Sequence, residues 1–250
     1  MRALVQVADD VFVATSRTMS TTSTVVVRDG RALLVDPAWQ PDELADLAAT
    51  LVDRGWTVTA GFATHAHHDH LLWHPGFGAA PRFASPRTAR LAADERAALV
   101  AELGDFPSDL VDLMGRVTPV EALPRDAVSG LDVELVVHDA HAPGHTALWL
   151  PQSRVLVVGD LLSDVEIPLP LDPDDLPAYL AGLETLAPYV ARAAVLIPGH
   201  GTLTTDPSAR LAADLRYLEA VAAGGGDDDP RLADPEMRTA HARLRDLVAR

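Results

Sequence analysis

Residues 63–70, Ala-Thr-His-Ala-His-His-Asp-His, hold the densest group of side chains that could do chemistry. Four imidazoles and one carboxylate lie within the six positions from His65 to His70. Side chains two residues apart in an extended segment point the same way, so His65 and His67 can face one point while Asp69 and His70 approach it from the turn that follows. Imidazole and carboxylate groups bind divalent transition metals. The spacing therefore favours two neighbouring metal ions, and the alternative is a solvated histidine-rich loop.

Three later segments carry ligand types of the same kind, each beside an expected strand. His145 follows a Pro-Gly turn, Asp160 follows the run Val-Leu-Val-Val-Gly, and His200 follows Val-Leu-Ile-Pro-Gly. A rigid sheet can fix a side chain at a strand end while the neighbouring loop leaves room for a substrate. One such piece alone is usually only a turn, but four of them in order favour a metal site over chance.

The elements that must position these residues follow from the hydrophobic pattern, which predicts an α/β protein. Strands are expected at residues 3–8, 11–15, 24–28, 31–35, 56–63, 82–85, 133–138, 146–150, 155–158 and 194–197. Helices are expected at residues 41–54, 86–103, 104–115, 173–186, 207–223 and 235–250. The Asp29-Gly30 pair is a strong hairpin signal. The pattern leaves open whether residues 86–116, the least regular part, cover the site as a lid.

The composition excludes some kinds of metal ligand and makes some kinds of partner unexpected. The 250 residues include no cysteine, so thiolate ligands and disulfides are excluded. The net charge of −16 repels polyanions, so nucleic acid and anionic membranes are not expected as partners. No apolar run reaches the ~20 residues that span a bilayer, and the first residues lack the apolar core of a signal peptide, so a cytoplasmic protein is expected.

The motifs H-x-H-x-D-H, P-G-H-T, G-D and P-G-H-G, in that order, resemble the metallo-β-lactamase superfamily, from about residue 3 to residue 205. The resemblance implies a four-layered αββα sandwich, with two mixed β-sheets flanked by helices and the site at one edge of the sheets. It also implies that two metal ions are bound. His65, His67 and His145 would hold the first ion, Asp69, His70 and His200 would hold the second, and Asp160 would bridge them.

The chemistry expected of this ligand set is hydrolysis. Zinc suits the ligands, and iron, manganese or cobalt would also be accepted. A hydroxide bridging the two ions would attack an ester, lactone or thioester carbonyl of a small molecule, with Asp69 and Asp160 as the catalytic carboxylates. Asp36 resembles the aspartate that orients a ligand histidine from behind.

Differences from known branches of the superfamily reduce the number of functions expected for this sequence. Asp160, the absent cysteine and the absent leader disfavour antibiotic hydrolysis. Ser163 stands where the lactonases carry a tyrosine, and the glutathione-binding signature of glyoxalase II is not recognised, although these two branches remain the nearest in pattern. A mononuclear iron sulfur dioxygenase, using His65, His145 and Asp160, and a phosphodiesterase are the alternatives.

The remaining expectations concern the pocket and the tail. Trp39, Trp73, His74 and Ser163 are candidates for shaping a partly apolar pocket. His68 is expected to be solvated, whereas His141 is left open as a neighbour of the ligands. The run Gly-Gly-Gly-Asp-Asp-Asp-Pro at 224–230 predicts a flexible break between a catalytic domain, residues 1–223, and a last helix in residues 224–250 that packs on it without forming part of the active site. Monomer and homodimer both remain open.

Overall fold

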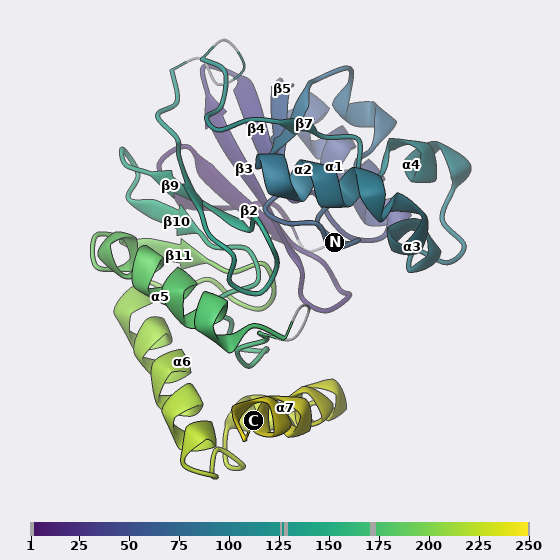
Figure 1. The fold of residues 1–250 in the computed structure, drawn as a ribbon. Helices are drawn as coiled ribbons and strands as arrows, with labels where there is room; N and C mark the ends of the chain where they lie inside the picture. Colours follow the sequence, from purple (N-terminus) through teal and green to yellow (C-terminus); the bar gives the residue numbers. More distant parts are fainter. Residues whose placement is uncertain (1–2, 126, 128–129, 171–173, 250) are drawn as a thin grey trace.

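The computed structural model describes residues 3–125, 127, 130–170 and 174–249. Two β-sheets face one another, and helices cover the outer face of each sheet (Figure 1). The first sheet has the order β1-β2-β3-β4-β5-β6-β7. Its strands are β1 (Val5–Ala8), β2 (Val11–Thr15), β3 (Thr22–Arg28), β4 (Arg31–Val35), β5 (Thr57–Phe62), β6 (Arg82–Ala84) and β7 (Thr118–Pro119).

The second sheet has the order β11-β10-β9-β8. Its strands are β8 (Glu134–Val137), β9 (Thr146–Leu150), β10 (Val155–Val157) and β11 (Val195–Ile197). Pairing is antiparallel from β1 to β4 and parallel from β4 to β7, while in the second sheet only β10 and β11 pair in parallel. Both sheets are therefore mixed, as predicted.

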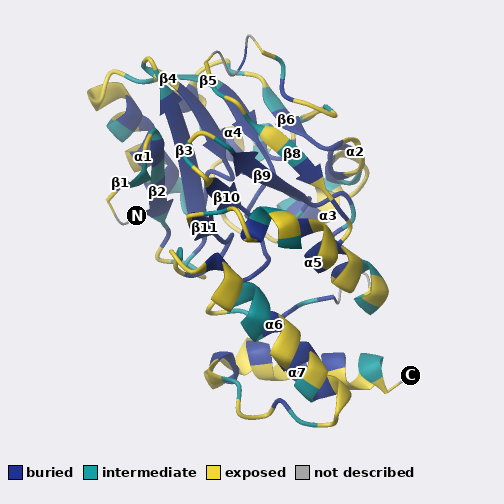
Figure 2. Cartoon of the chain, turned by 90° about the vertical axis from the view of Figure 1, so that its left-hand side faces the viewer, coloured by how far each residue is buried: buried dark blue, intermediate teal, exposed yellow. Residues whose placement is uncertain are grey.

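Three hydrophobic clusters hold the four layers together. Along β4, Ala32 and Leu34 pack with the helices outside the first sheet, whereas Leu33 and Val35 pack between the two sheets. Side chains alternate in the same way along β10, because successive residues of a strand point to opposite faces. The burial pattern of Figure 2 shows both sheets buried and the outer faces of the helices exposed. The αββα sandwich is confirmed.

The helices outside the first sheet are shorter than the sequence predicts. They are α1 (Pro41–Asp53), α2 (Pro86–Asp94), α3 (Arg96–Ala101) and α4 (Ser108–Leu113), and a 3-10 turn, η1 (Pro75–Phe77), packs beside α1. The helix predicted at 86–103 is interrupted at Glu95, where φ is −103° and ψ is 8°. Leu99, Leu110 and Met114 bury their side chains in the outer cluster of the first sheet. Residues 86–116 therefore cover a sheet face.

The helices outside the second sheet are α5 (Leu176–Val190) and α6 (Pro207–Ala222). Asp175 caps α5 by accepting a hydrogen bond from the Ala178 backbone N–H. The helix therefore begins three residues later than predicted, and the predicted start at residue 173 lies outside the described residues. Within the described ranges, no helix combines the length and the apolar character that crossing a membrane requires.

The C-terminal segment packs against α6. The N–H groups of Gly224 and Gly225 donate to carbonyls of the last turn of α6, so the glycine run is a hydrogen-bonded helix end. A second 3-10 turn, η2 (Pro230–Ala233), leads into α7 (Pro235–Val248), which lies against α6 (Figures 1 and 2). Met237 and Leu244 of α7 join the outer cluster of the second sheet.

Candidate metal centre

The histidine-rich loop begins where β5 ends, and Asp36 begins the loop after the neighbouring parallel strand β4. Asp36 accepts hydrogen bonds from the Thr64 backbone N–H at 2.8 Å and from the Thr64 hydroxyl at 2.6 Å. Its Oδ2 also lies 2.9 Å from His70 Nδ1. One buried carboxylate thus fixes the start of the loop and the orientation of His70, leaving Nε2 of this ring to face the cluster.

The second sheet brings its residues to the same edge. Asp160 follows β10 and His200 follows the parallel strand β11, while His145 directly precedes the antiparallel strand β9, so all three lie at one end of the sheet. Hydrogen bonds join the two sheets there: Thr22 N–H donates to Gly199 O at 2.7 Å, and Thr146 N–H donates to Thr64 O at 2.9 Å.

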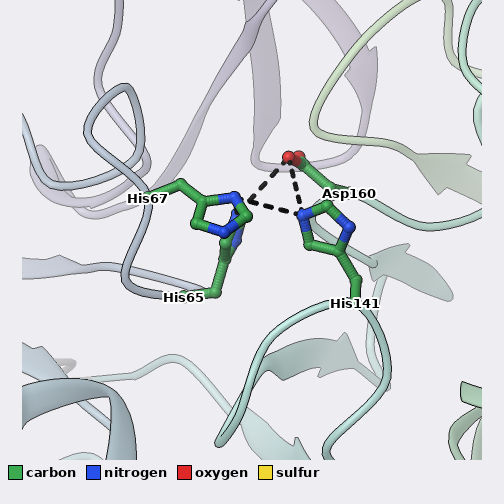
Figure 3. Close-up of side chains that lie close together, drawn as sticks. All are labelled: His65, His67, His141 and Asp160. Atoms are coloured by element: carbon green, nitrogen blue, oxygen red, sulfur yellow. Dashed lines mark hydrogen bonds and ion pairs between the residues drawn. The ribbon is translucent and has the colours of Figure 1, made fainter. Parts of the chain in front are cut away.

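A first group of ligand atoms comes from His65, His67, His141 and Asp160, which lie within 4.8 Å of one another (Figure 3). His67 Nδ1 lies 3.0 Å from His65 Nε2 and 3.2 Å from His141 Nε2. Three nitrogen atoms and one oxygen atom therefore converge on one point, a donor set that suits zinc.

A second group comes from Asp69, His70 and His200, all buried. Asp69 Oδ2 lies 3.3 Å from Nε2 of both His70 and His200, and the two imidazole nitrogens lie 3.4 Å apart. Separations of this size are those of neighbouring ligands about 2.1 Å from one ion.

Asp160 lies between the two groups. Its Oδ2 is 3.3 Å from His65 Nε2, and its Oδ1 is 3.1 Å from His70 Nε2. Its Oδ2 also lies 3.2 Å from His200 Nε2. This carboxylate contacts imidazoles that were assigned to both ions from the sequence.

His145, expected as a ligand of the first ion, belongs to none of the groups of potential ligands among the described residues. Among the described residues, the first group contains His141 and not His145. The ring of His145 lies behind His65, with ring centroids 4.8 Å apart, and a Cβ atom on Gly159 would come within 2.2 Å of His145 Nε2. Within the described part of the chain, both ring nitrogens of His145 are buried without a hydrogen-bond partner. The glycine before Asp160 is thus required for His145 to approach the cluster.

Burial sets the protonation of the first group. Burial lowers the pKa of His65 well below its ordinary value, and the neighbouring His70 lowers it further. Burial, with His141 adding to it, lowers the pKa of His67 to about 3. Burial also lowers the pKa of His145. These imidazoles are neutral at pH 7, which is the form that binds metal.

Carboxylates set the protonation of the second group. Burial disfavours the charged form of His70, but Asp160 and Asp69 outweigh it and raise the pKa of His70 well above its ordinary value. Burial is likewise outweighed at His200, whose pKa is raised by Asp160 and Glu166. Although burial alone would raise the pKa of Asp69, His70 and His200 lower it well below its ordinary value.

The donor atoms fit divalent metal ions. Asp69 Oδ2 and Asp160 Oδ1 are buried, and the imidazole nitrogens 3.1–3.3 Å from them do not have the geometry of hydrogen-bond donors. A buried carboxylate oxygen without a partner is costly, and a cation held among these atoms would satisfy it. The two groups are therefore clusters that suit divalent ions.

A pocket of about 450 Å³ opens above the two groups. Its apolar walls come from Met19 and Leu169 and, on α7, from Met237 and Ala240. Glu166, Glu236 and Arg243 add charged groups to the lining, to which His68 and Thr239 also belong. The last helix, which was expected to lie outside the active site, therefore lines this pocket. Its side chains reach the pocket because the turn after α6 folds α7 back, which no local pattern reveals.

The four residues predicted to shape the pocket lie outside it. Trp39 is buried against His68, with ring centroids 5.1 Å apart, and Trp73 packs on Phe77. His74 caps η1 by accepting from Gly76 N–H, and Ser163 donates to the His200 carbonyl at 2.8 Å. Trp39 and Trp73 were expected in the pocket because they are large aromatic residues. They are instead buried where the first sheet packs against its helices. His68, expected to be solvated, is partly buried and lines the pocket.

Sequence reasoning missed Glu166. It belongs to the loop that follows Asp160, and the structure gathers Glu166, Asp160 and His200 in a third group of potential ligands. A single glutamate in a Pro-rich loop forms no motif with its neighbours, so the sequence pattern does not identify it as a ligand.

A sequence model of the metallo-β-lactamase superfamily matches residues 17–220. The chain belongs to this superfamily. The match spans every residue of the three ligand groups, whereas η2 and α7 lie beyond it. No curated protein matches the sequence significantly.

Solved structures of this superfamily share the fold. A β-lactamase domain protein from Burkholderia ambifaria is 19% identical, with a TM-score of 0.67 over 98% of this chain and 86% of that chain. A metallo-β-lactamase family protein from Thermus thermophilus is 21% identical, with a TM-score of 0.63 over 96% of this chain and 90% of that one. The DIM-1 metallo-β-lactamase is 18% identical, with a TM-score of 0.60, and the alignment covers 86% and 97% of the two chains. At these identities, the likeness concerns the fold.

Proposed function

We propose that this superfamily member is a dinuclear metal-dependent hydrolase that cleaves an ester, lactone or thioester bond of a small molecule. The position of Asp160 carries the proposal, because its two oxygens lie 3.3 Å from His65 Nε2 and 3.1 Å from His70 Nε2. A carboxylate between two imidazole groups can hold two cations close together. When bound, two such ions lower the pKa of a water molecule and polarise a substrate oxygen.

The chain's own residues supply orientation and proton handling. Asp69 is buried beside the second group, and its Oδ2 accepts no hydrogen bond from the described residues. The carboxylate of Asp69 is placed to orient the attacking water and to receive its proton. Asp36 keeps Nε2 of His70 directed at the cluster by binding Nδ1 at 2.9 Å.

The pocket favours a small acyl compound over a phosphate anion. Its walls are apolar at Met19, Leu169 and Met237, and the glutamates Glu166 and Glu236 add negative charge. The net charge of −16 also repels polyanionic substrates, including nucleic acid.

The decisive experiment compares Asp160→Asn with the matched surface variant Asp94→Asn, whose side chain is 62% exposed at the end of α2. Each purified protein is assayed on lactones, thioesters, aryl esters and phosphodiesters, and its metal content is measured by mass spectrometry. Asp160→Asn should reduce the best rate by orders of magnitude and lower the metal content, whereas Asp94→Asn should match the wild type.

Three outcomes contradict the proposal. Wild-type activity in Asp160→Asn would remove the role of the bridging carboxylate. A wild type that carries one iron and no zinc would favour the sulfur dioxygenase. A phosphodiester as the best substrate would overturn the acyl specificity.

A further inference from the structure

Glu166 lines the pocket and belongs to the third group of potential ligands. It lies outside the four sequence motifs that resemble the superfamily. Its potential ligand atom, those of Asp160 and that of His200 all lie within 4.8 Å of one another. His200 belongs to the second group and Asp160 contacts His70 of that group, so Glu166 lies beside the second group on the pocket side.

The backbone of Glu166 is fixed on both sides. Its N–H donates to Ser163 Oγ at 3.1 Å, and its carbonyl accepts from Arg231 Nη1 at 3.0 Å. Arg231 is buried and is itself held by Asp214 at 2.6 Å. The Glu166 carboxylate, in contrast, accepts no hydrogen bond from any residue in the described ranges. A carboxylate presented by a rigid loop and left without a donor is suited to a cation.

We infer that Glu166 is a further ligand of the second metal ion. The inference rests on the proposed dinuclear centre, and Glu166 would join that ion on the side formed by Asp160 and His200. An independent observation supports a cation here. Asp160 Oδ1 is buried without a hydrogen bond from the described residues, and Asp160 belongs to the group that contains Glu166 and His200.

The two ions are then held by chemically different donors. The group of Asp160, Glu166 and His200 contains two carboxylates and one imidazole, whereas the first group contains three imidazoles and the shared Asp160. Carboxylate-rich sites suit manganese and iron(II), and imidazole-rich sites suit zinc. The second site should therefore retain Mn²⁺ better than the first, and Glu166 is the residue that creates this preference.

The test compares the wild type, Glu166→Gln and a matched control, Glu236→Gln. Glu236 lines the same pocket, but it lies on α7 and in none of the ligand groups. The full-length proteins are stripped with a chelator and titrated with Mn²⁺, with free Mn²⁺ followed by electron paramagnetic resonance, and then with Zn²⁺ by calorimetry. Glu166→Gln should weaken Mn²⁺ binding at one of two sites by about 10-fold or more. It should weaken Zn²⁺ binding less, and Glu236→Gln should bind both metals like the wild type.

Thermal unfolding of the stripped proteins separates a ligand role from a structural one. Gln keeps the shape of Glu166 and removes a negative charge near Asp160, so the stripped variant should unfold no earlier than the wild type. Unchanged Mn²⁺ affinity in Glu166→Gln would overturn the inference while leaving the dinuclear hydrolase intact. Earlier unfolding with equal loss of both ions would also overturn it. A wild type that binds one ion per chain would instead overturn the dinuclear centre itself.

Discussion

The two ligand groups lie side by side and share Asp160, yet their electrostatics are opposite. In the first group, burial lowers the pKa of His65 and brings that of His67 to about 3. In the second group, burial is outweighed by carboxylates, and the pKa values of His70 and His200 are raised well above the ordinary value.

The difference comes from what each group faces. His65 is surrounded by other imidazoles, with the rings of His67, His141 and His145 centred 4.5, 5.1 and 4.8 Å from its own. His70 has Asp36 on one ring nitrogen and Asp69 and Asp160 on the other. The same edge of the two sheets thus holds a group of neutral imidazoles beside a group rich in carboxylates, because the ends of different strands supply the side chains around each group.

Among changes that should affect one ligand group more than the other, Arg231→Met is expected to have the largest effect. This change leaves Asp214 buried without its cation, and breaking such a pair costs ~3–5 kcal/mol of the free energy of unfolding. Arg231 also donates to the carbonyls of Ser163 and Glu166, so the second ion should be lost before the first. Denaturant unfolding and metal analysis measure both effects.

The double variant Arg231→Met/Asp214→Asn is the control for Arg231→Met. It removes both charges of the pair and should recover part of the stability. Equal loss of both ions in a folded Arg231→Met protein would show that the C-terminal segment supports the whole centre.

A smaller effect is expected from Asp36→Asn, which keeps the size of the side chain but weakens its hold on His70 Nδ1. Loss of such a supporting contact typically costs about 10–100-fold in metal affinity. The loss should fall on the second ion, as measured by calorimetry on stripped protein. If the first ion weakened as much, the Thr64 contacts of Asp36 would control both groups.

Acidification should also separate the groups. Raised pKa values mean that His70 and His200 take up protons in stripped protein at and below neutral pH, and protons compete with metal. Lowered pKa values mean that His65 and His67 stay neutral as the pH falls well below 6. Dialysis from pH 7.5 to pH 5.5, followed by mass spectrometry, should therefore release the second ion first. Simultaneous release would show that the ions are bound as one unit.

The smallest effect is expected from Trp39→Phe. Trp39 lies outside the pocket, and its indole N–H is buried without a partner among the described residues. KM and both metal affinities should stay unchanged, and the free energy of unfolding should change by no more than about 1 kcal/mol, because removal of an unpartnered buried N–H offsets the poorer packing of a smaller ring. A change in KM would place Trp39 in contact with substrate after all.

Much of the fold could be predicted because its signals are local. Alternating apolar residues marked the strands, and the strand ends marked Asp160 and His200 beside the histidine-rich loop. The Asp-Gly pair at 29–30 joins β3 and β4, where both residues have positive φ. Helix limits were less accurate, because the break at Glu95 and the cap at Asp175 depend on how each helix packs on its sheet.

By itself, the sequence determined the histidine and aspartate motifs that offer metal-binding atoms, and the resemblance that these motifs carry implied two mixed sheets. The tertiary structure decided which of these atoms meet. His141 adopts a positive φ of 66° and reaches the first group, while His145 lies against Gly159. The tertiary structure also places Glu166 near His200 and places α7 along the pocket. These contacts join residues that are distant in sequence and depend on long-range packing, which local periodicity does not encode.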